Sequence, residues 1–378
     1  MRIGIAAVLG TCGGPRTYAR ALVEALARAD SDHEYWVLTD RPEAVPRARQ
    51  VRAVHVPLAS RYAQPWWDHV GVPSAVRALG LDLLHHTKAA LPLGLRVPSV
   101  VSVYDAAPFL HARTFTPLQA LHHRHHIRHA ARRAGRLVTI SEEARAELAD
   151  ALDLDRERIV VVPPGSIDGA APRRAGAAAE AARAARALFA RLGIDGPYAL
   201  ALGTVQPRKD LRTVVEAYAR FRGRTGTRLQ LVIAGRDGWR DGEAGRCDSR
   251  CGPSGTTRAV VRTGVLSDDE VEILVAHARL AVNASLYEGF GLAVLEAMAH
   301  GVPLVSTPVP ALSGATDGAY LRVAVGDVGG LSCAIERLAR DPALRLALGA
   351  RGRGHAARFS WDDTARATLA VYREVARG

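Results

Sequence analysis

Short hydrophobic runs alternate with stretches of helical periodicity along almost the whole chain. Apolar runs separated by amphipathic helices are typical of parallel sheets whose strands are connected by helices. The pattern therefore predicts an α/β fold with doubly wound parallel sheets. One set of predicted strands covers residues 3–9, 35–39, 51–58, 81–86, 97–105, 136–141 and 158–165, and a second set covers 197–204, 228–235, 259–265, 278–285 and 302–308.

The chain is long enough for two such domains. Its 378 residues exceed the size at which a single hydrophobic core usually stops growing. An alanine- and arginine-rich stretch between the two sets predicts a mobile hinge near residues 169–183, followed by a helix. We predict Rossmann-like domains over 1–170 and 196–358, a linker over 171–195, and a terminal helix over 359–378 that returns to the first domain. Two such domains would face a central cleft at the carboxyl ends of their strands.

The composition is that of a globular protein rich in arginine. The formal net charge is +12, and Lys88 and Lys209 are the only lysines. An excess of positive charge suits anionic ligands but does not indicate which kind of anion is bound. A nucleic-acid-binding module would need a basic groove with stacking aromatic residues, whereas aromatic residues are 5% of this chain and the charges are spread over both halves. We therefore expect no nucleic-acid partner.

The location and the thiol state follow from what the sequence contains. No segment reaches the roughly eighteen uninterrupted apolar residues of a membrane span. The apolar start passes directly into a turn and a helix, unlike a signal peptide, so we expect a cytoplasmic protein. The sequon formed by Asn283, Ala284 and Ser285 then has no role. Scattered cysteines favour reduced thiols over a disulfide framework or a zinc site, and they are Cys12, Cys247, Cys251 and Cys333.

The most informative stretch is SLYEGFGLAVLEAMAHGVPLVST, residues 285–307. A buried strand precedes it, Gly289 and Gly291 bracket a tight turn, residues 292–299 have helical composition, and Gly301 ends the helix. The first amides of a helix lack intrahelical acceptors and carry the positive end of its dipole, and glycines let the backbone approach a ligand closely. The sequence therefore predicts an anion site at this turn.

Two glutamates flank the predicted turn. Glu296 lies one turn after Leu292, so its carboxylate could accept hydrogen bonds from both hydroxyls of a ribose whose diphosphate lies at the helix start. Glu288 precedes the turn and faces the same side. Two glutamates eight residues apart are, on their own, more typical of a helix start and a solvated helix face. The glycines between them and the cations described next favour a ligand site.

Two cations follow the first strand of the second set. Arg208 and Lys209 come directly before a helix that is predicted to begin near Asp210. Cations at a helix start oppose the helix dipole, which mildly favours a functional role over a solvated basic loop. Either could neutralise a diphosphate leaving group.

The first strand-to-helix turn of the chain is also rich in glycine. Gly10, Gly13 and Gly14 do not spell the dinucleotide fingerprint GxGxxG, and no well-placed acidic residue ends the second strand, which argues against a nicotinamide enzyme. Gly13 and Gly14 could still admit donor phosphates or an acceptor.

Two further loops follow strands of the first set. Tyr104 and Asp105 are expected in a ligand-facing loop at the carboxyl end of the strand over 97–105. Ser141 follows the next strand and is more typical of a helix cap than of a substrate contact.

A basic stretch holds six histidines and six arginines between His111 and Arg136, with no acidic residue. We expect a basic helix, and its apolar residues Leu118, Leu121 and Ile127 do not form the wide stripe that inserts into a bilayer. The histidines could suggest a metal site, but a solvated helix face is the better interpretation. Peripheral attraction to an anionic membrane remains open.

Taken together, these motifs resemble retaining glycosyltransferases of family 4, which have the GT-B fold. The similarity spans nearly the whole chain and resembles the branch typified by mannosyltransferases of surface polysaccharide synthesis. Its most specific segments are GTVQPRKDL, IAGRDGW, TGVLSDDEV, the stretch over 285–307 and the terminal FSW segment.

The resemblance implies a role for each matching residue. The first domain would bind the acceptor and the second the nucleotide-sugar donor, with no metal and no other cofactor. Glu296 would bind the ribose, and Arg208 and Lys209 the diphosphate. The remaining implied donor contacts are Glu288 with Gly289, Phe290, Gly291 and Leu292 around the transferred sugar, Gly264 and Val265 beside the base, and Gly13 and Gly14 along the cleft.

Two positions depart from the family pattern. Thr204 occupies a position where many relatives carry another arginine, so leaving-group stabilisation would depend more on Arg208 and Lys209. Tyr104 occupies a position where a histidine often contacts the sugar, which leaves Asp105 as the matching polar residue. The candidate catalytic residues are then Glu288, Asp105, Lys209 and Arg208.

The expected activity is transfer of a hexosyl group from a nucleoside-diphosphate sugar to a hydroxyl of a glycan, a lipid-linked glycan or a small natural product, with retention of configuration. A front-face route, in which the leaving phosphate accepts the acceptor's proton, would need no protein nucleophile. A nucleotide-sugar epimerase and a non-catalytic sugar-nucleotide-binding protein are the alternatives.

Overall fold

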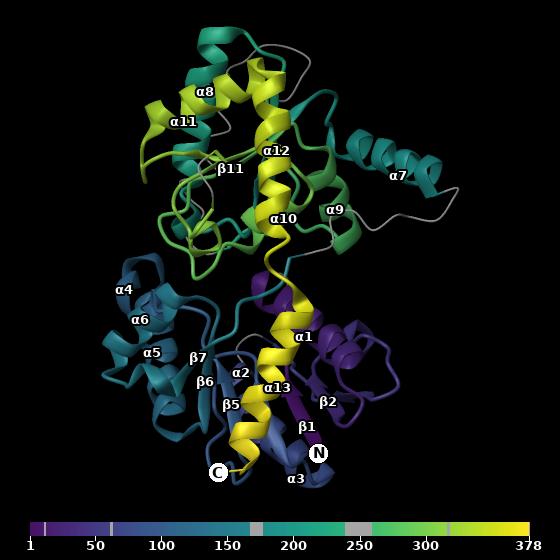
Figure 1. Cartoon of the computed structure of the whole chain (residues 1–378), viewed down its shortest axis with the longest axis vertical. Coiled ribbons are helices and arrows are strands. Elements are labelled where there is room, and N and C mark those ends of the chain that lie inside the picture. The colour runs from purple at the N-terminus through teal and green to yellow at the C-terminus, as the bar shows by residue number, and fades with distance from the viewer. Residues whose placement is uncertain (11–12, 61–62, 167–176, 239–258, 316–317, 378) are drawn as a thin grey trace. The chain divides into compact units, whose positions relative to one another are not determined.

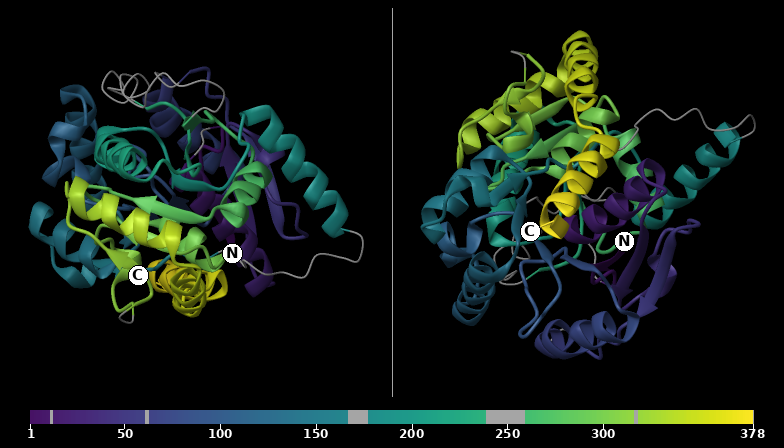
Figure 2. Two further views of the ribbon diagram at one scale, coloured as in Figure 1. Left: turned by 90° about the horizontal axis from the view of Figure 1, so that it is seen from above. Right: turned by 60° about the horizontal axis from the view of Figure 1, so that its bottom comes forward.

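The computed structural model describes residues 1–10, 13–60, 63–166, 177–238, 259–315 and 318–377 (Figure 1). The chain forms two compact units. The first unit comprises Met1–Gly165 together with Phe359–Gly378, and the second unit comprises Ser166–Arg358. Each unit has its own parallel sheet with helices on its faces (Figure 2). The prediction of an α/β fold with two doubly wound parallel sheets is confirmed.

The described part of the first unit contains a seven-stranded sheet in the order β3-β2-β1-β4-β5-β6-β7. All its strand pairs are parallel. The strand order reverses between β1 and β4. The chain adds β2 and β3 on one side of β1, and then β4 to β7 on the other side. The strands are β1 Arg2–Ala6, β2 Glu34–Thr39, β3 Val51–His55, β4 Leu83–His86, β5 Ser99–Ser102, β6 Arg136–Thr139 and β7 Ile159–Val161.

Helices connect these strands on both faces of the sheet. Short 3₁₀ turns and one π-helical turn, Trp67–Gly71, lie between the longer helices. The helices are α1 Gly14–Ala29, α2 Gln64–Trp66, α3 Val72–Leu79, α4 Ala107–Leu110, α5 Pro117–Arg133, α6 Glu142–Leu152 and α13 Trp361–Arg377.

The last helix, α13, packs against the first unit's sheet and α1 (Figure 1). The Tyr372 hydroxyl lies 2.7 Å from His85 Nδ1, and His85 Nε2 lies 2.8 Å from Ser102 Oγ, so a buried polar chain connects α13 to β4 and β5. Burial lowers the pKa of His85 to about 3, so this imidazole is neutral. Ser360 Oγ accepts a hydrogen bond from the Asp362 amide at the start of the helix. The polar chain therefore fixes the helix to the sheet without a buried charge.

The described part of the second unit contains a six-stranded parallel sheet in the order β10-β9-β8-β11-β12-β13. Its order reverses between β8 and β11. The strands are β8 Tyr198–Leu202, β9 Gln230–Ala234, β10 Val260–Arg262, β11 Leu280–Asn283, β12 Leu304–Ser306 and β13 Leu321–Arg322. The helices are α7 Ala177–Leu192, α8 Leu211–Thr225, α9 Asp268–His277, α10 Leu292–Ala299, α11 Val328–Arg340 and α12 Pro342–Ala356.

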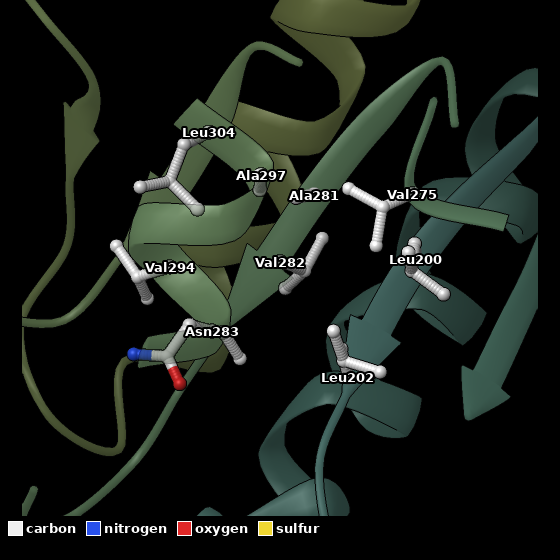
Figure 3. Close-up of a pocket in the computed structure, with 10 residues that line it drawn as sticks. Leu200, Leu202, Val275, Ala281, Val282, Asn283, Val294, Ala297 and Leu304 are labelled. Carbon is white, nitrogen blue, oxygen red and sulfur yellow. The ribbon is translucent and has the colours of Figure 1, made fainter. Parts of the chain in front are cut away.

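The core of the second unit lies between the sheet and helices α8 and α11. Tyr218 and Phe221 of α8 are fully buried there, and the Tyr218 hydroxyl donates to the Leu229 carbonyl at 2.6 Å. On the other side, a cavity of about 20 Å³ separates α10 from β8 and β11 (Figure 3). This is room for about one water molecule. Its lining is apolar apart from Asn283, so α10 rests on the strands with a small packing gap.

Helix α7 belongs to the second unit. Ala185 and Leu188 are buried, and the Phe189 ring packs edge-on against Tyr198 and His277. The span over 171–195 that the sequence suggests as a linker therefore includes a packed helix. Residues 171–176, together with Cys12, Cys247 and Cys251, lie outside the described residues. Cys333 is an exposed free thiol.

The basic stretch differs from the predicted single helix in its limits and its burial. Thr116 caps α5 in a reciprocal capping box with Gln119, and Pro117 occupies the first turn, so the helix begins there and not near His111. It ends before Arg136, which starts β6. The interpretation of a solvated histidine face is wrong for His126, which is 8% exposed and stacks on His69 at 5.1 Å.

In the described ranges, no helix is both long and apolar enough to cross a membrane.

Candidate active site

The strand order of the second unit brings the two most informative motifs together. β8 and β11 are neighbours, with Leu280 paired to Ala199 and Ala281 to Leu200. The loop after β8 carries Arg208 and Lys209, and the loop after β11 carries residues 285–291. Both loops therefore leave the carboxyl edge at the point where the strand order reverses, which is where open α/β sheets bind ligands.

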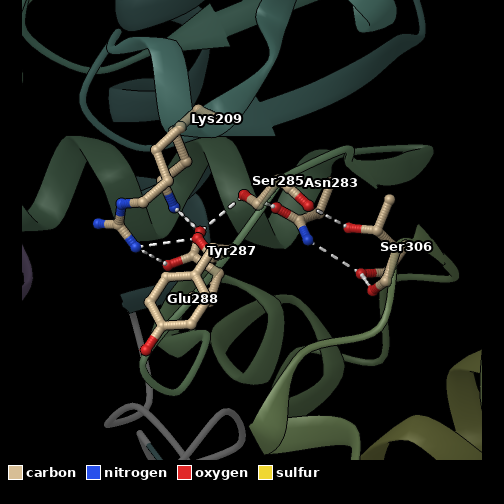
Figure 4. Close-up of polar contacts among 8 residues, drawn as sticks. Lys209, Asn283, Ser285, Tyr287, Glu288 and Ser306 are labelled. Atoms are coloured by element: carbon tan, nitrogen blue, oxygen red, sulfur yellow. Dashed lines mark hydrogen bonds and ion pairs between the residues drawn. The ribbon is translucent and has the colours of Figure 1, made fainter. Parts of the chain in front are cut away.

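Both cations contact Glu288 (Figure 4). Lys209 Nζ lies 2.5 Å from Glu288 Oε1, and an Arg208 guanidinium nitrogen lies 3.3 Å from Glu288 Oε2. The same Arg208 nitrogen donates to the Tyr287 carbonyl at 2.9 Å, and the Arg208 carbonyl accepts from the Leu286 amide at 2.8 Å. The two loops are thus joined by an ion-pair cluster and by backbone hydrogen bonds.

The local sequence explains how the cations reach this edge. Residues Pro207–Lys209 form a 3₁₀ turn, and Asp210 adopts a left-handed conformation with φ of 43°. The Asp210 carboxylate then accepts from the Thr213 amide and caps α8. Because Asp210 caps the helix, the two cations lie before it and do not meet its positive dipole end directly.

Glu288 is held as a carboxylate. Its side chain is only 10% exposed, and burial alone would raise its pKa, but the charges of Lys209 and Arg208 and the hydrogen bonds from Lys209 and Ser285 together lower the pKa below its ordinary value. A buried charge of this kind is stable only while its partners remain.

Glu296 has the opposite electrostatics. Burial raises its pKa to about 7, the nearby negative charge of Asp268 adds to the rise, and Lys209 opposes it. Lys209 therefore lies within electrostatic reach of both glutamates. The site combines an ionised carboxylate with a second carboxylate that titrates near neutral pH.

The turn before α10 depends on a glycine. Gly291 has a φ of 108°, and a Cβ atom there would lie 2.9 Å from Val309 Cγ2. No side chain caps α10, and the first intrahelical bonds are from Val294 and Leu295 to the Gly291 carbonyl. The amides of Leu292 and Ala293 thus have no acceptor within the helix and carry its positive end.

Substituting Gly291 with alanine is expected to lower the free energy of unfolding by about 1–3 kcal/mol, because the new methyl group adds backbone strain to a contact with Val309. The unfolding transition of the second unit in urea measures this change in free energy. Gly223→Ala in α8 is the matched control, because its Cβ would meet nothing within 4 Å. Equal stability of Gly291→Ala and the control would show that the turn does not need a glycine.

The other predicted donor-binding residues of the second unit lie outside the ion-pair cluster. Gly264 and Val265 follow β10, which is separated from β8 by β9, and Val265 is 64% exposed. Gly264 has a φ of 68° with open space around its Cα. Thr204 comes two residues after the end of β8 and is half-buried. These residues share the carboxyl edge of the sheet with the ion-pair cluster, and no hydrogen bond or ion pair joins them to it within the described residues.

The predicted residues of the first unit also lie at the carboxyl edge of their sheet. Gly13 caps α1 with a φ of 105°, next to Gly14 at the helix start. Asp105 Oδ1 accepts from the Ala107 amide at 3.0 Å. The Tyr104 hydroxyl donates to the Thr87 carbonyl, and its ring packs edge-on against Tyr18. Tyr104 is therefore half-buried and held by contacts within the first unit.

Ser141 accepts a hydrogen bond from the Ala144 amide at 3.0 Å, so its predicted role as a helix cap is confirmed. Over the described ranges, no three histidine, cysteine, aspartate or glutamate side chains converge in a way that could hold a metal ion.

Sequence reasoning missed a buried polar chain beside Glu288. Ser285 Oγ lies 2.7 Å from Glu288 Oε1, and Asn283 and Ser306 continue the chain (Figure 4). Neither Asn283 nor Ser285 stands out in the sequence as a partner of Glu288. The available signal was their position, since polar residues that end apolar parallel strands lie at the ligand-binding edge.

Comparison with known families agrees with this arrangement. Residues 12–166 match the family described as Glycosyltransferase Family 4, and residues 196–341 match Glycosyl transferases group 1. The chain belongs to the glycosyltransferases of family 4. Curated relatives include O-antigen chain mannosyltransferase B of Escherichia coli, 32% identical over 63% of this chain and 60% of the relative. A D-inositol 3-phosphate glycosyltransferase of Acidothermus cellulolyticus is 34% identical over 64% of this chain and 53% of the relative.

The matches to these glycosyltransferases thus span between about half and three-fifths of the relatives' own length. Solved structures share the fold of the whole chain. A sucrose-phosphate synthase from Thermosynechococcus elongatus has a TM-score of 0.76 at 21% identity, covering 98% of both chains. Anabaena HepE, solved in complex with UDP and glucose, has a TM-score of 0.74 at 16% identity, covering 99% of both. The fold is GT-B.

Proposed function

We propose that this family 4 glycosyltransferase moves a hexosyl group from a nucleoside-diphosphate sugar to an acceptor hydroxyl with retention of configuration. The observation that carries the proposal is the pair of cations, Arg208 and Lys209, held on Glu288 beside an uncapped helix start. This arrangement supplies two point charges and free amides where a diphosphate leaving group would develop negative charge.

Each side chain has a role that suits its chemistry. Arg208 and Lys209 neutralise the leaving diphosphate, and the amides at the start of α10 assist them. Glu296 accepts hydrogen bonds from the ribose hydroxyls. Glu288, with Gly289, Phe290 and Gly291, positions the transferred sugar. With the cations in this role, no metal ion is needed for charge neutralisation.

The chemical step needs no protein nucleophile. The acceptor oxygen forms a bond to the anomeric carbon on the face from which the diphosphate leaves, and the bond between that carbon and the phosphate oxygen breaks. The acceptor's proton passes to the leaving phosphate. Trapping of a glycosyl adduct on Glu288 or Asp105 would refute this route in favour of a double displacement.

The relatives suggest which donors to test. Mannosyltransferases among the relatives favour mannose, and the UDP and glucose bound in the HepE structure favour UDP-glucose. Glycans, lipid-linked glycans and small polyols are the acceptor classes to test, with surface polysaccharide synthesis as the biological setting.

A thermal-shift screen tests the donor site. We expect UDP-, GDP- or ADP-sugars to raise the melting temperature progressively with concentration, since a ligand that binds only the folded state stabilises it by mass action. One base should give the largest shift. Inorganic phosphate at equal ionic strength is the control. A protein that no nucleotide sugar stabilises would contradict the proposal, and conversion of a donor into its epimer without acceptor would favour an epimerase.

We also propose that the protein acts in the cytoplasm and is attracted to anionic membranes through α5. The solvent-facing side of this helix carries Leu118, Leu121, His125, Arg128 and Arg132, with the two leucines 77% and 65% exposed. In the part of the chain that the structure describes, neither arginine forms an ion pair, and Arg128 packs over the Phe109 ring at 5.4 Å. An acid-free cationic face suits anionic lipid headgroups.

Sedimentation with vesicles tests this attraction. Vesicles containing anionic lipid should bind the protein at low salt and release it at high salt, and neutral vesicles should not bind it. Arg128→Gln with Arg132→Gln should weaken binding about fivefold for each arginine removed. Arg47→Gln with Arg49→Gln, which removes the same charge from an exposed part of the first unit, is the control. Unchanged binding in the α5 variant would refute the role of this helix.

A further inference from the structure

The polar chain beside Glu288 runs across the ends of two neighbouring strands (Figure 4). Glu288 Oε1 lies 2.7 Å from Ser285 Oγ, which lies 2.8 Å from Asn283 Oδ1. Asn283 Nδ2 lies 3.0 Å from Ser306 Oγ, and Ser306 Oγ lies 2.6 Å from the Thr307 carbonyl. Ser285 and Ser306 are fully buried. The polar chain therefore connects Glu288, at the carboxyl edge of the sheet, to the backbone after β12.

This polar chain has one hydrogen fewer than it has hydrogen-bond contacts. The four contacts need four hydrogens. Ser285 and Ser306 supply one hydrogen each. The Asn283 side chain supplies the third, because its Nδ2 donates in one contact while its Oδ1 accepts in the other. Three hydrogens are therefore available when Glu288 is ionised. Turning the Asn283 amide around does not help, because the contact between Ser306 and the Thr307 carbonyl then lacks its hydrogen.

A proton on Glu288 completes the chain. The neutral carboxyl would donate to Ser285, Ser285 to Asn283, Asn283 to Ser306, and Ser306 to the Thr307 carbonyl. Every hydroxyl and amide then donates in one direction and every contact has its hydrogen. Ser285 donates to the charged form of Glu288, and with its hydroxyl turned round it accepts from the neutral form, so the same side chains can hold both forms.

In the structure, the two cations favour the charged form. Arg208 and Lys209 both contact the carboxylate, and no other charged side chain touches it among the described residues. Glu296 of α10 lies within electrostatic reach of the same Lys209. These are the cations that our proposed function assigns to the donor diphosphate. A diphosphate that draws them away would leave Glu288 as a buried anion beside a second anion, which strongly favours proton uptake.

We propose that Ser285, Asn283 and Ser306 form a hydrogen-bond chain that holds Glu288 in two protonation states, as a carboxylate against both cations in the empty site and as a neutral carboxyl when a diphosphate takes them. The proton comes from solvent and stays on Glu288 Oε1, facing Ser285 Oγ. Ser285 is a positioning residue in this account. The inference rests on the proposed function, because it assumes that the diphosphate contacts Arg208 and Lys209.

Proton uptake on binding is the first test. Calorimetric titration of UDP, GDP or ADP into the full chain at about pH 8, in buffers of different ionisation enthalpy, should show uptake approaching one proton per nucleotide bound. At that pH Glu296, with a pKa of about 7, is already mostly ionised and contributes little. Glu288→Gln should bind without uptake. Binding by the wild-type chain without proton uptake would overturn this inference and leave the proposed function standing.

Ser285 variants separate positioning from general stability. Ser285→Thr keeps the hydroxyl and should keep the uptake. Ser285→Ala removes the acceptor for the neutral carboxyl, so it should lose the uptake and lower kcat about tenfold or more, as expected for a lost hydrogen bond to an ionisable group. Uptake and kcat equal to wild type in Ser285→Ala would overturn the role of Ser285.

A second measurement does not depend on nucleotide binding. In Arg208→Gln/Lys209→Met, both cations are absent permanently, so Glu288 should be protonated at about pH 7. Infrared difference spectra between this variant and the same variant with Glu288→Gln should then show the carbonyl band of a neutral carboxyl. Adding Ser285→Ala should shift that band, because its hydrogen bond is lost. Absence of the band would refute the chain's capacity for a proton even if no nucleotide binds.

Discussion

Replacing Lys209 with methionine is expected to lower kcat for sugar transfer by about 10²–10³-fold. Lys209 supplies a charge that stabilises the leaving diphosphate in the transition state, and the loss of one such preorganised group typically costs that much. The same change removes the 2.5 Å ion pair from Glu288, which is only 10% exposed. Breaking a buried pair on one side costs about 3–5 kcal/mol of unfolding free energy. Steady-state kinetics and urea denaturation measure the two effects.

A double variant separates these two effects. Lys209→Met/Glu288→Gln no longer contains the buried acid that has lost its lysine partner, so it should recover most of the lost stability while kcat stays low. Arg224→Met is the control. It breaks the exposed pair with Glu336, and should cost less than about 1 kcal/mol and leave kcat unchanged. A Lys209→Met enzyme with wild-type kcat would contradict the assigned role of this lysine.

In Glu288→Gln, which cannot take up a proton at this position, donor binding is expected to strengthen as the pH rises through about 7. Glu296 accepts hydrogen bonds from both ribose hydroxyls only as a carboxylate, and burial raises its pKa to about 7. The apparent KM of this variant for the donor should therefore be lowest above pH 7 and should rise up to tenfold per pH unit below it. Adding Glu296→Gln should raise the KM about 100-fold at pH 8, as expected for two hydrogen bonds to a charged group, and should abolish this pH dependence.

The stability of the free protein should depend on Glu296 in the opposite sense. The folded-state pKa is raised above its ordinary value of 4.5, so the folded protein binds more protons than the unfolded chain between those values. The unfolding free energy should fall as the pH rises from about 4.5 through 7. Comparison of denaturation curves for wild type and Glu296→Gln isolates this contribution. Identical pH profiles of KM and of stability with and without Glu296→Gln would show that Glu296 has no such role.

Much of the fold could be predicted from the sequence because its signals are local. The apolar runs that become β1, β8 and β11 and the glycines around α10 act within a few residues. Each strand forms in its predicted run but ends two or three residues earlier than the sequence indicated. The limits of α5 could have been predicted as well, since Thr116 and Pro117 form a local capping signal that outweighs the continuous run of basic residues.

The residues of the candidate site could be proposed from the sequence, but their contacts could not. Glu288 lies about 80 residues after Arg208 and Lys209 in the chain, and only the pairing of β8 with β11 brings the three together. The burial of His126 and the engagement of Tyr104 by Thr87 also depend on packing between distant segments. The chain through Ser285 depends on hydroxyl and amide orientations that no sequence pattern specifies.

The most direct test of the account is to follow the anomeric carbon of the donor sugar. The full chain is incubated with α-configured UDP-, GDP- and ADP-sugars labelled with ¹³C at that carbon, with and without a panel of polyol and glycan acceptors, and NMR spectra are recorded over time. We expect release of the nucleoside diphosphate and first appearance of an α-linked product with one of the donors. A β-linked product, or no turnover of any donor while the Lys209→Met protein binds nucleotides as tightly as wild type, would contradict the central claim.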